Sequence, residues 1–163
     1  MRGLAIFALL TALPIGSAVA GEPRSPCDLA TKADVRQVLG GLPVAPDPAT
    51  IGEETAPYCL WTTGEGGARV KLEIWSPDEL QVLGLADARA YFIKRQREAL
   101  AHGGIRLRVH GFAIFRTRFR TGGDPNAGGE IGVLKRGRTL IFEFEHVSRA
   151  RAERFARAGA HRF

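Results

Sequence analysis

Alternating apolar and polar residues are the clearest pattern in this chain, and such alternation is typical of half-buried β-strands. Within residues 68–75, Val70, Leu72 and Ile74 alternate with charged side chains. Similar patterns, separated by glycine-containing turns, predict strands at residues 58–62, 68–75, 105–109, 112–120, 130–136 and 139–146. Because short turns join most of these segments, we expect neighbouring strands to pair antiparallel.

Three helices are expected around these strands. Thr31 and Asp34 have the spacing of a capping box in front of a short helix. Residues 86–101 have helical periodicity, and Ser148 is a suitable cap for a final helix over residues 149–161. The order of elements is therefore helix, two strands, helix, further strands, helix.

This order predicts an α+β fold. The apolar face of an antiparallel sheet must be covered, and helices are the elements available to cover it. We expect an α+β sandwich: a single antiparallel sheet with helices packed on one or both faces. Residues 42–57 hold four prolines and no periodicity, so a loop is expected there. Residues 21–163 have the length of one globular domain.

Residues 1–20 have the layout of a cleavable signal peptide. Arg2 precedes about ten apolar residues, and Ala18 and Ala20 provide the small residues of a cleavage site. The apolar stretch is about half as long as the roughly 20 residues that a membrane span needs. No later stretch is long and apolar enough to span, so we expect no transmembrane segment after cleavage. The location predicted is periplasmic or secreted.

The chain has two cysteines, Cys27 and Cys59. In an oxidising compartment such a pair predicts one disulfide. Arg24-Ser25-Pro26 precede Cys27, whereas a lipid-modified cysteine follows small apolar residues. Lipid attachment is therefore not expected.

Charge is unevenly distributed along the chain. Residues 21–90 carry a net charge of −5, whereas residues 91–163 carry +10 and are rich in arginine. Arginine suits bidentate pairing with carboxylate or phosphate. Such a polarised chain either pairs its two halves internally or presents a basic face to an anionic partner.

The most basic strands are the candidate binding site. Alternation is expected to place six basic side chains on one open face of the sheet: Arg106, Arg108, His110, Arg116, Arg118 and Arg120. Such a face suits phosphate, a nucleic acid, an anionic glycan or an acidic protein. The alternative is that Glu73, Glu143 and Glu145 on adjacent strands neutralise these cations by cross-strand pairing.

The final helix is also basic, with Arg149, Arg151, Arg154, Arg157 and Arg162. A basic amphipathic helix can lie on an anionic membrane. Its apolar side is small and rich in alanine, which favours packing onto the sheet instead.

Catalytic and metal-binding motifs are not found in the sequence. The four histidines lack metal-ligand spacing, and residues 124–135 begin like a calcium loop but end in Lys135 where glutamate is needed. No serine lies in a G-x-S-x-G motif. We therefore expect no cofactor, no metal site and no catalytic residue.

Four segments carry a family resemblance. Residues 27–40 contain Cys-x-Leu, Thr-x-x-Asp-Val and Leu-Gly, and residues 58–61 read Tyr-Cys-Leu-Trp. Together with residues 109–113 and the Val-x-x-x-Gly of residues 133–137, they resemble secreted Cys–Trp proteins of unknown function, many of them actinobacterial lipoproteins. Phe112 and Ala113 replace the Leu-Gly of that family. The resemblance implies a PsbP-like αβα sandwich and a Cys27–Cys59 disulfide, and it implies no activity.

From the sequence we expect an exported protein of the cell envelope. Its expected function is that of a non-catalytic binding or accessory module, with an anionic ligand or an envelope protein as its partner. The alternative is a structural or interaction subunit that uses Tyr58, Trp61 and Trp75. A small periplasmic enzyme is the third interpretation, and it requires a deep pocket with an ionisable pair.

Overall fold

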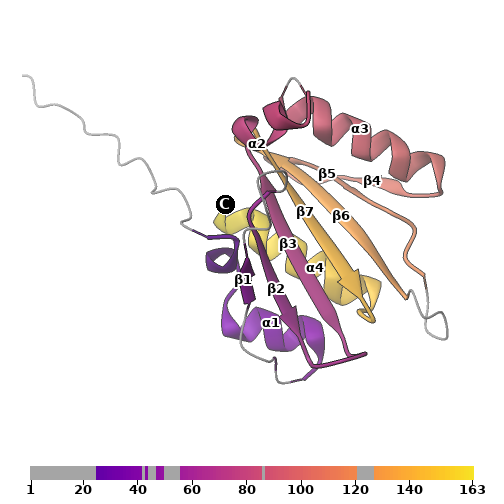
Figure 1. Cartoon of the computed structure of the whole chain (residues 1–163). Coiled ribbons are helices and arrows are strands. Elements are labelled where there is room, and N and C mark those ends of the chain that lie inside the picture. Colours follow the sequence, from indigo (N-terminus) through magenta and orange to yellow (C-terminus); the bar gives the residue numbers. More distant parts are fainter. Residues whose placement is uncertain (1–24, 42, 44–46, 50–55, 86, 121–126) are drawn as a thin grey trace, which may run out of the picture.

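The computed structural model describes residues 25–41, 43, 47–49, 56–85, 87–120 and 127–163 (Figure 1). The predicted signal peptide lies outside these residues. The strands form an antiparallel sheet in the spatial order β1-β2-β3-β7-β6-β5-β4. Their bounds are β1 Asp47–Ala49, β2 Tyr58–Thr62, β3 Arg69–Trp75, β4 Ile105–Leu107, β5 Ala113–Arg116, β6 Gly128–Lys135 and β7 Arg138–Glu145.

Helices lie on both faces of this sheet, which confirms the predicted α+β class. They are the 3₁₀ turn η1 (Pro26–Leu29), α1 (Lys32–Leu39), α2 (Pro77–Val82), α3 (Ala88–Ala101) and α4 (Arg149–Arg162). In Figure 1, α4 lies behind the sheet.

The larger part of the core lies between the sheet and the layer formed by α1 and α4. Val35 and Val38 of α1 and Phe155 of α4 pack against the sheet residues Leu72 and Phe142. The rings of Phe142 and Phe155 meet edge to face at 6.1 Å. The apolar side of α4 is therefore buried on the sheet, as its alanine-rich composition predicted, and is not available to a membrane.

The second core lies on the opposite face, under α2 and α3. Leu80 and Phe92 pack there with Trp75, Phe115 and Ile141. β7 therefore contributes to both cores, because Ile141 points to this face whereas its neighbours Leu140 and Phe142 point to the other. A strand that is buried on both faces loses strict alternation.

Local hydrogen bonds begin and end α1 as the sequence predicted. The Asp34 amide donates to Thr31 Oγ1 at 3.2 Å, and the Thr31 amide donates to the Asp34 carboxylate at 2.9 Å. The two bonds satisfy amides that have no partner within the helix. Gly40 ends the helix in the left-handed conformation with φ +74°, which glycine adopts without strain.

The predicted disulfide is present. It joins Cys27 of η1 to Cys59 of β2, with Cα atoms 5.1 Å apart. It therefore fixes the start of the described chain to the sheet, beside α1.

Several elements differ from the sequence prediction. β1 lies within the residues expected to be loop, and α2 was not expected, although Ser76 and Glu79 form a capping box in front of it. Both elements have too few residues to show a recognisable hydrophobic periodicity. β4 and β5 are shorter than the predicted strands and end at Leu107 and Arg116.

Within the described residues, no helix combines the length and apolarity that a membrane crossing requires.

Candidate functional site

The six predicted binding residues do not share one face of the sheet. The β4–β5 register sets Arg106 opposite Phe115 and Ile105 opposite Arg116, so Arg106 and Arg116 lie on different faces. Arg116 faces α4, where its Nε lies 2.9 Å from Oε1 of Glu153, an ion pair without hydrogen-bond alignment. The expected single basic sheet face is therefore wrong. The reason is that Ile114 and Phe115 are both buried, one on each face, so alternation could not identify the exposed side.

The other four predicted residues lie beyond the strands or at their ends. Arg108 and His110 are exposed in the connection after β4. Arg118 follows β5 and is also exposed, and Arg120 forms an isolated bridge with Gly128. The structure thus disperses the six residues over both sides of the sheet.

Two of the three predicted neutralising glutamates have other partners. Glu145 pairs with Arg69 at 3.1 Å, and Glu73 pairs with Lys71. Both cations belong to β3 itself. These two glutamates therefore do not pair with any of the six basic residues.

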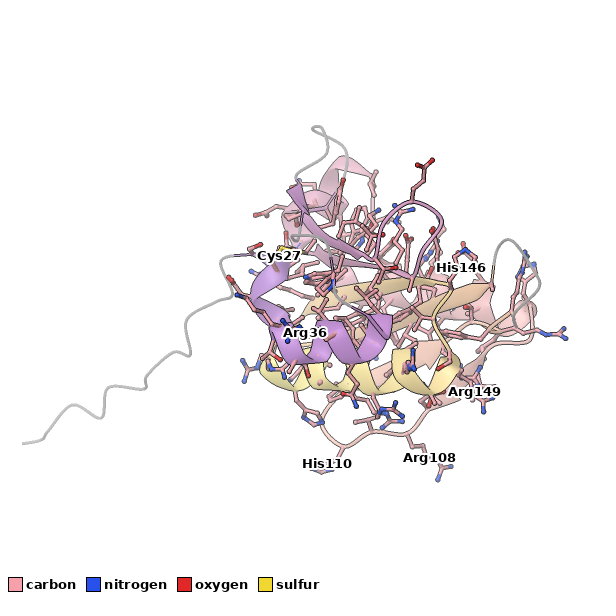
Figure 2. All side chains as sticks on the ribbon, turned by 90° about the horizontal axis from the view of Figure 1, so that it is seen from below. Cys27, Arg36, Arg108, His110, His146 and Arg149 are labelled. Atoms are coloured by element: carbon pink, nitrogen blue, oxygen red, sulfur yellow. A yellow bond between two sulfur atoms is a disulfide. The ribbon has the colours of Figure 1, made fainter. Side chains whose placement is uncertain are left out.

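Another basic surface lies on the layer formed by α1 and α4, and we call it the basic face. Figure 2 shows Arg36 of α1 and Arg149 of α4 on this side of the molecule, with Arg108 and His110 along the far side of α4. The face consists of Arg36, Arg108, Arg149, Arg151, Arg154 and Arg157. All six are exposed except Arg157, which is half-buried.

The acidic residues of the two helices are already paired. α1 contains one acidic residue, Asp34, which lies 2.7 Å from Arg162, and α4 contains one, Glu153, which pairs with Arg116. Although burial opposes it, hydrogen bonds from Thr31 and the nearby Arg162 guanidinium lower the pKa of Asp34. Within the described residues, no ion pair or side-chain hydrogen bond engages any of the six arginines of the basic face.

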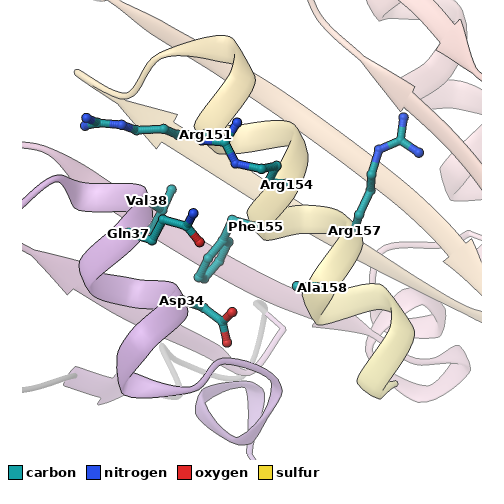
Figure 3. A pocket seen from close by; sticks show the side chains of 8 residues that line it. All are labelled: Asp34, Gln37, Val38, Arg151, Arg154, Phe155, Arg157 and Ala158. Carbon is teal, nitrogen blue, oxygen red and sulfur yellow. The ribbon is translucent and has the colours of Figure 1, made fainter.

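A groove of about 340 Å³ runs between α1 and α4 within this face (Figure 3). Val38, Phe155 and Ala158 form its apolar floor. Asp34 and Gln37 line it from α1, whereas Arg151, Arg154 and Arg157 line it from α4. Volumes of a few hundred Å³ are typical of sites for small ligands or for one unit of a polymer.

The three groove arginines are spaced at every third residue of α4. Each step of three residues advances about 4.5 Å along a helix and turns by about 60°. Figure 3 shows the result, with Arg151 reaching toward α1 and Arg157 extending from the other side of α4. The Arg151 guanidinium lies over Gly40, where a Cβ atom would overlap it. The arginines therefore fan across the face and do not converge on one point.

A cluster of glutamates lies on the opposite face of the sheet. Glu130 of β6 and Glu143 of β7 are direct cross-strand partners, and Glu73 of β3 lies nearby. Glu130 pairs with Arg95 of α3. Glu73 accepts a hydrogen bond from Trp75 Nε1 at 3.0 Å in addition to its pair with Lys71.

Glu143 is the member of this cluster that lacks a pairing partner among the described residues. Among the described residues, none forms a hydrogen bond or an ion pair with its carboxylate. Burial, with Glu73 nearby, raises the pKa of Glu143 against the opposing effect of Lys71. Burial also raises the pKa of Glu130, although Arg95 opposes it. Burial raises the pKa of Tyr91, which lies beside these groups, to about 12.

One described cavity reaches part of this cluster. The cavity of about 230 Å³ that reaches Glu130 is lined by Arg95, His102 and Thr117 and does not include Glu143. Within the described residues, no group of three or more histidine, cysteine, aspartate or glutamate side chains has metal-binding geometry. The ionisable pair required by the enzyme interpretation is present, but this cavity does not enclose it.

The tryptophans are buried, which removes the surface required by the interaction-subunit interpretation. Trp61 is 3% exposed and packs edge to face on Phe155 at 5.8 Å. Trp75 is 6% exposed and packs on Tyr91 at 4.9 Å. Tyr58 is half-buried under Lys71, whose Nζ lies 4.9 Å from the ring centroid.

Sequence reasoning identified the arginines of α4 but not the groove that they line. Its other wall is α1, more than a hundred residues earlier in the chain, and no local pattern connects the two helices.

Comparison with known proteins does not assign this site. No family model, curated protein or solved structure matches this chain.

Proposed function

We propose that this protein is an exported, non-catalytic binding module of the cell envelope, and that its basic face binds an anionic glycan. The observation that carries the proposal is that the groove arginines have no ion-pair partner among the described residues. Both acidic residues of α1 and α4 have cationic partners, so a set of arginines without described counter-charges remains. An external anion is the partner that their charge favours.

The layout of the arginines supports an extended ligand. A single phosphate needs donors that converge on one point, whereas the three groove arginines fan across the face at intervals of about 4.5 Å along α4. Arg36 and Arg108 continue the positive surface on either side of α4. A linear polymer with repeated sulfate, phosphate or carboxylate groups can contact several arginines at once.

The disulfide supports the envelope location. Disulfides persist in oxidising compartments, and this one is formed by both cysteines of the chain. Together with the signal-peptide pattern of residues 1–20, it favours export, and an envelope compartment contains anionic glycans.

Retention on heparin–agarose in a NaCl gradient tests the proposal. We expect the oxidised protein to be retained, and R151Q/R154Q to elute at clearly lower salt. The matched control is K94Q/R118Q, which removes the same charge from exposed positions outside the groove. We expect this control to elute close to the wild-type protein.

Two results would contradict the proposal. One is the absence of retention of the wild-type protein at low salt. The other is an equal shift in both variants, which would show that only net charge matters.

Two further outcomes would favour other interpretations. Because Arg118 belongs to the six residues predicted from the sequence, a larger shift in the control would favour that predicted site. Retention on an acidic protein matrix but not on heparin would point to a protein partner.

A further inference from the structure

A second arginine-lined groove lies on the other face of the sheet, beside α3. It has a volume of about 500 Å³ and runs between α3 and the strands β4, β5 and β6. Its floor is apolar and consists of Phe92 and Ile93 from α3 with Ala113 and Leu134 from the strands. Phe92 is buried, whereas Ala113 is exposed and Ile93 and Leu134 are half-buried. The floor therefore leaves apolar surface in contact with water.

Three arginines surround this floor. Arg89 and Arg97 lie two turns apart on α3, and Arg106 lies on β4. All three are exposed, and none forms an ion pair or a side-chain hydrogen bond with the described residues. Gln96 adds a neutral hydrogen-bonding group to the lining.

The carboxylates of this face lie on the other flank of α3. Glu98 is the one acidic residue of α3, and it lies 3.8 Å from Arg95. Glu130 of β6 also pairs with Arg95. β4 and β5 contain no acidic residue. The described lining of the groove thus includes three guanidinium groups and no carboxylate.

We propose that this groove binds a single-headed anionic amphiphile, an alkyl chain that ends in a carboxylate or phosphate. The chain covers the exposed apolar floor, which removes its surface from water. The head group pairs with the arginines, whose planar guanidinium groups match carboxylate and phosphate oxygens. The volume lies within the range of about 300–1,000 Å³ that is typical of small-molecule sites.

This site is independent of the basic face. It lies on the opposite side of the sheet, and none of the residues that line it lines the groove between α1 and α4. The ligands also differ, because one groove suits a polymer with many charges and the other suits one charge with an alkyl chain. Each proposal can therefore fail while the other holds.

Titration with laurate below its micelle concentration, followed by calorimetry, tests the inference. Dodecyl phosphate replaces the head group by another anion, and dodecyltrimethylammonium replaces it by a cation on the same chain. We expect laurate and dodecyl phosphate to bind, and dodecyltrimethylammonium to bind at least tenfold more weakly. Butyrate, with the same head and a short chain, should not bind measurably.

Two variants locate the site. R97Q/R106Q should weaken laurate binding at least tenfold, whereas the control K94Q/R118Q should leave it within twofold of the wild-type value. A113W fills the floor without a change in charge and should also weaken binding. Since a tryptophan at this position can disturb folding, methyl NMR spectra of the wild-type protein provide a measurement without substitution. We expect laurate to shift the methyl signals of Ile93 and Leu134.

The inference is overturned if laurate does not bind, or if the cationic amphiphile binds as tightly as laurate. It is equally overturned if R97Q/R106Q binds like the control, or if the laurate-induced methyl shifts lie away from Ile93 and Leu134.

Discussion

Glu130 and Glu143 lie directly opposite each other on β6 and β7, although like charges at such positions repel. Arg95 compensates Glu130, whereas no described group pairs with Glu143. Burial raises the pKa of both carboxyls above their ordinary value of 4.5. The folded chain therefore binds these two protons more tightly than the unfolded chain does.

This arrangement predicts how stability depends on pH. When the folded state binds a proton more tightly, the free energy of unfolding falls as the pH rises from 4.5 through the raised pKa. E143Q should flatten this decline and stabilise the protein at pH 7 by roughly 0.2–1 kcal/mol, the range for a like-charged cross-strand pair. Urea unfolding of both proteins between pH 4.5 and pH 8 measures the difference.

The control for this prediction lies two residues further along the same strand. Glu145 is exposed and pairs with Arg69, so E145Q should be neutral or slightly destabilising at pH 7. If E143Q destabilises the protein at pH 7 as much as E145Q does or more, Glu143 has a stabilising partner and this account of the cluster is wrong.

The disulfide should contribute a large share of the stability. It closes a loop across a separation of 32 residues, for which chain entropy predicts roughly 3–4 kcal/mol. C27A is the better variant because Cys27 is only partly buried, whereas Cys59 lies in the core. Thermal unfolding should show a midpoint several degrees lower for C27A. With reductant present, the two midpoints should approach each other, and a difference unaffected by reductant would show that packing is the cause.

Gly132 and Phe115 provide a test of the core beneath α3. The two residues are cross-strand partners, and the Phe115 ring occupies the space where a Cβ atom at Gly132 would lie. G132A should therefore displace the ring from Phe92, on which it packs at 5.2 Å, and destabilise the protein by about 1–3 kcal/mol. In an F115L background the same substitution should cost less. Equal costs in the two backgrounds, measured by urea unfolding, would contradict the contact.

The sequence allowed most of the fold to be predicted because local signals and packing agreed. The capping box at Thr31 and the alternation of Val70, Leu72 and Ile74 each predicted an element that is present. β1 and α2 were missed because three and six residues are too few to show a period.

The candidate sites could be predicted less well, because they depend on which face each strand presents. Arg106 and Arg116 appeared equivalent in the alternating pattern. Only the registers of β5 with β4 and with β6 show that the two side chains lie on opposite faces of the sheet. Both grooves combine a helix with elements distant in sequence. The glutamate cluster likewise joins Glu73 to β6 and β7 through strand order, which alternation along one strand does not contain.

The most direct test of the basic face is a map of where an anionic glycan binds. Backbone amide shifts of the oxidised protein are measured by NMR during titration with a heparin dodecasaccharide. We predict that the largest changes fall at Arg36, Arg108 and residues 149–158 of α4, with little change along α3. Changes concentrated on α3 or β4, or no saturable change at low salt, would contradict the proposed function.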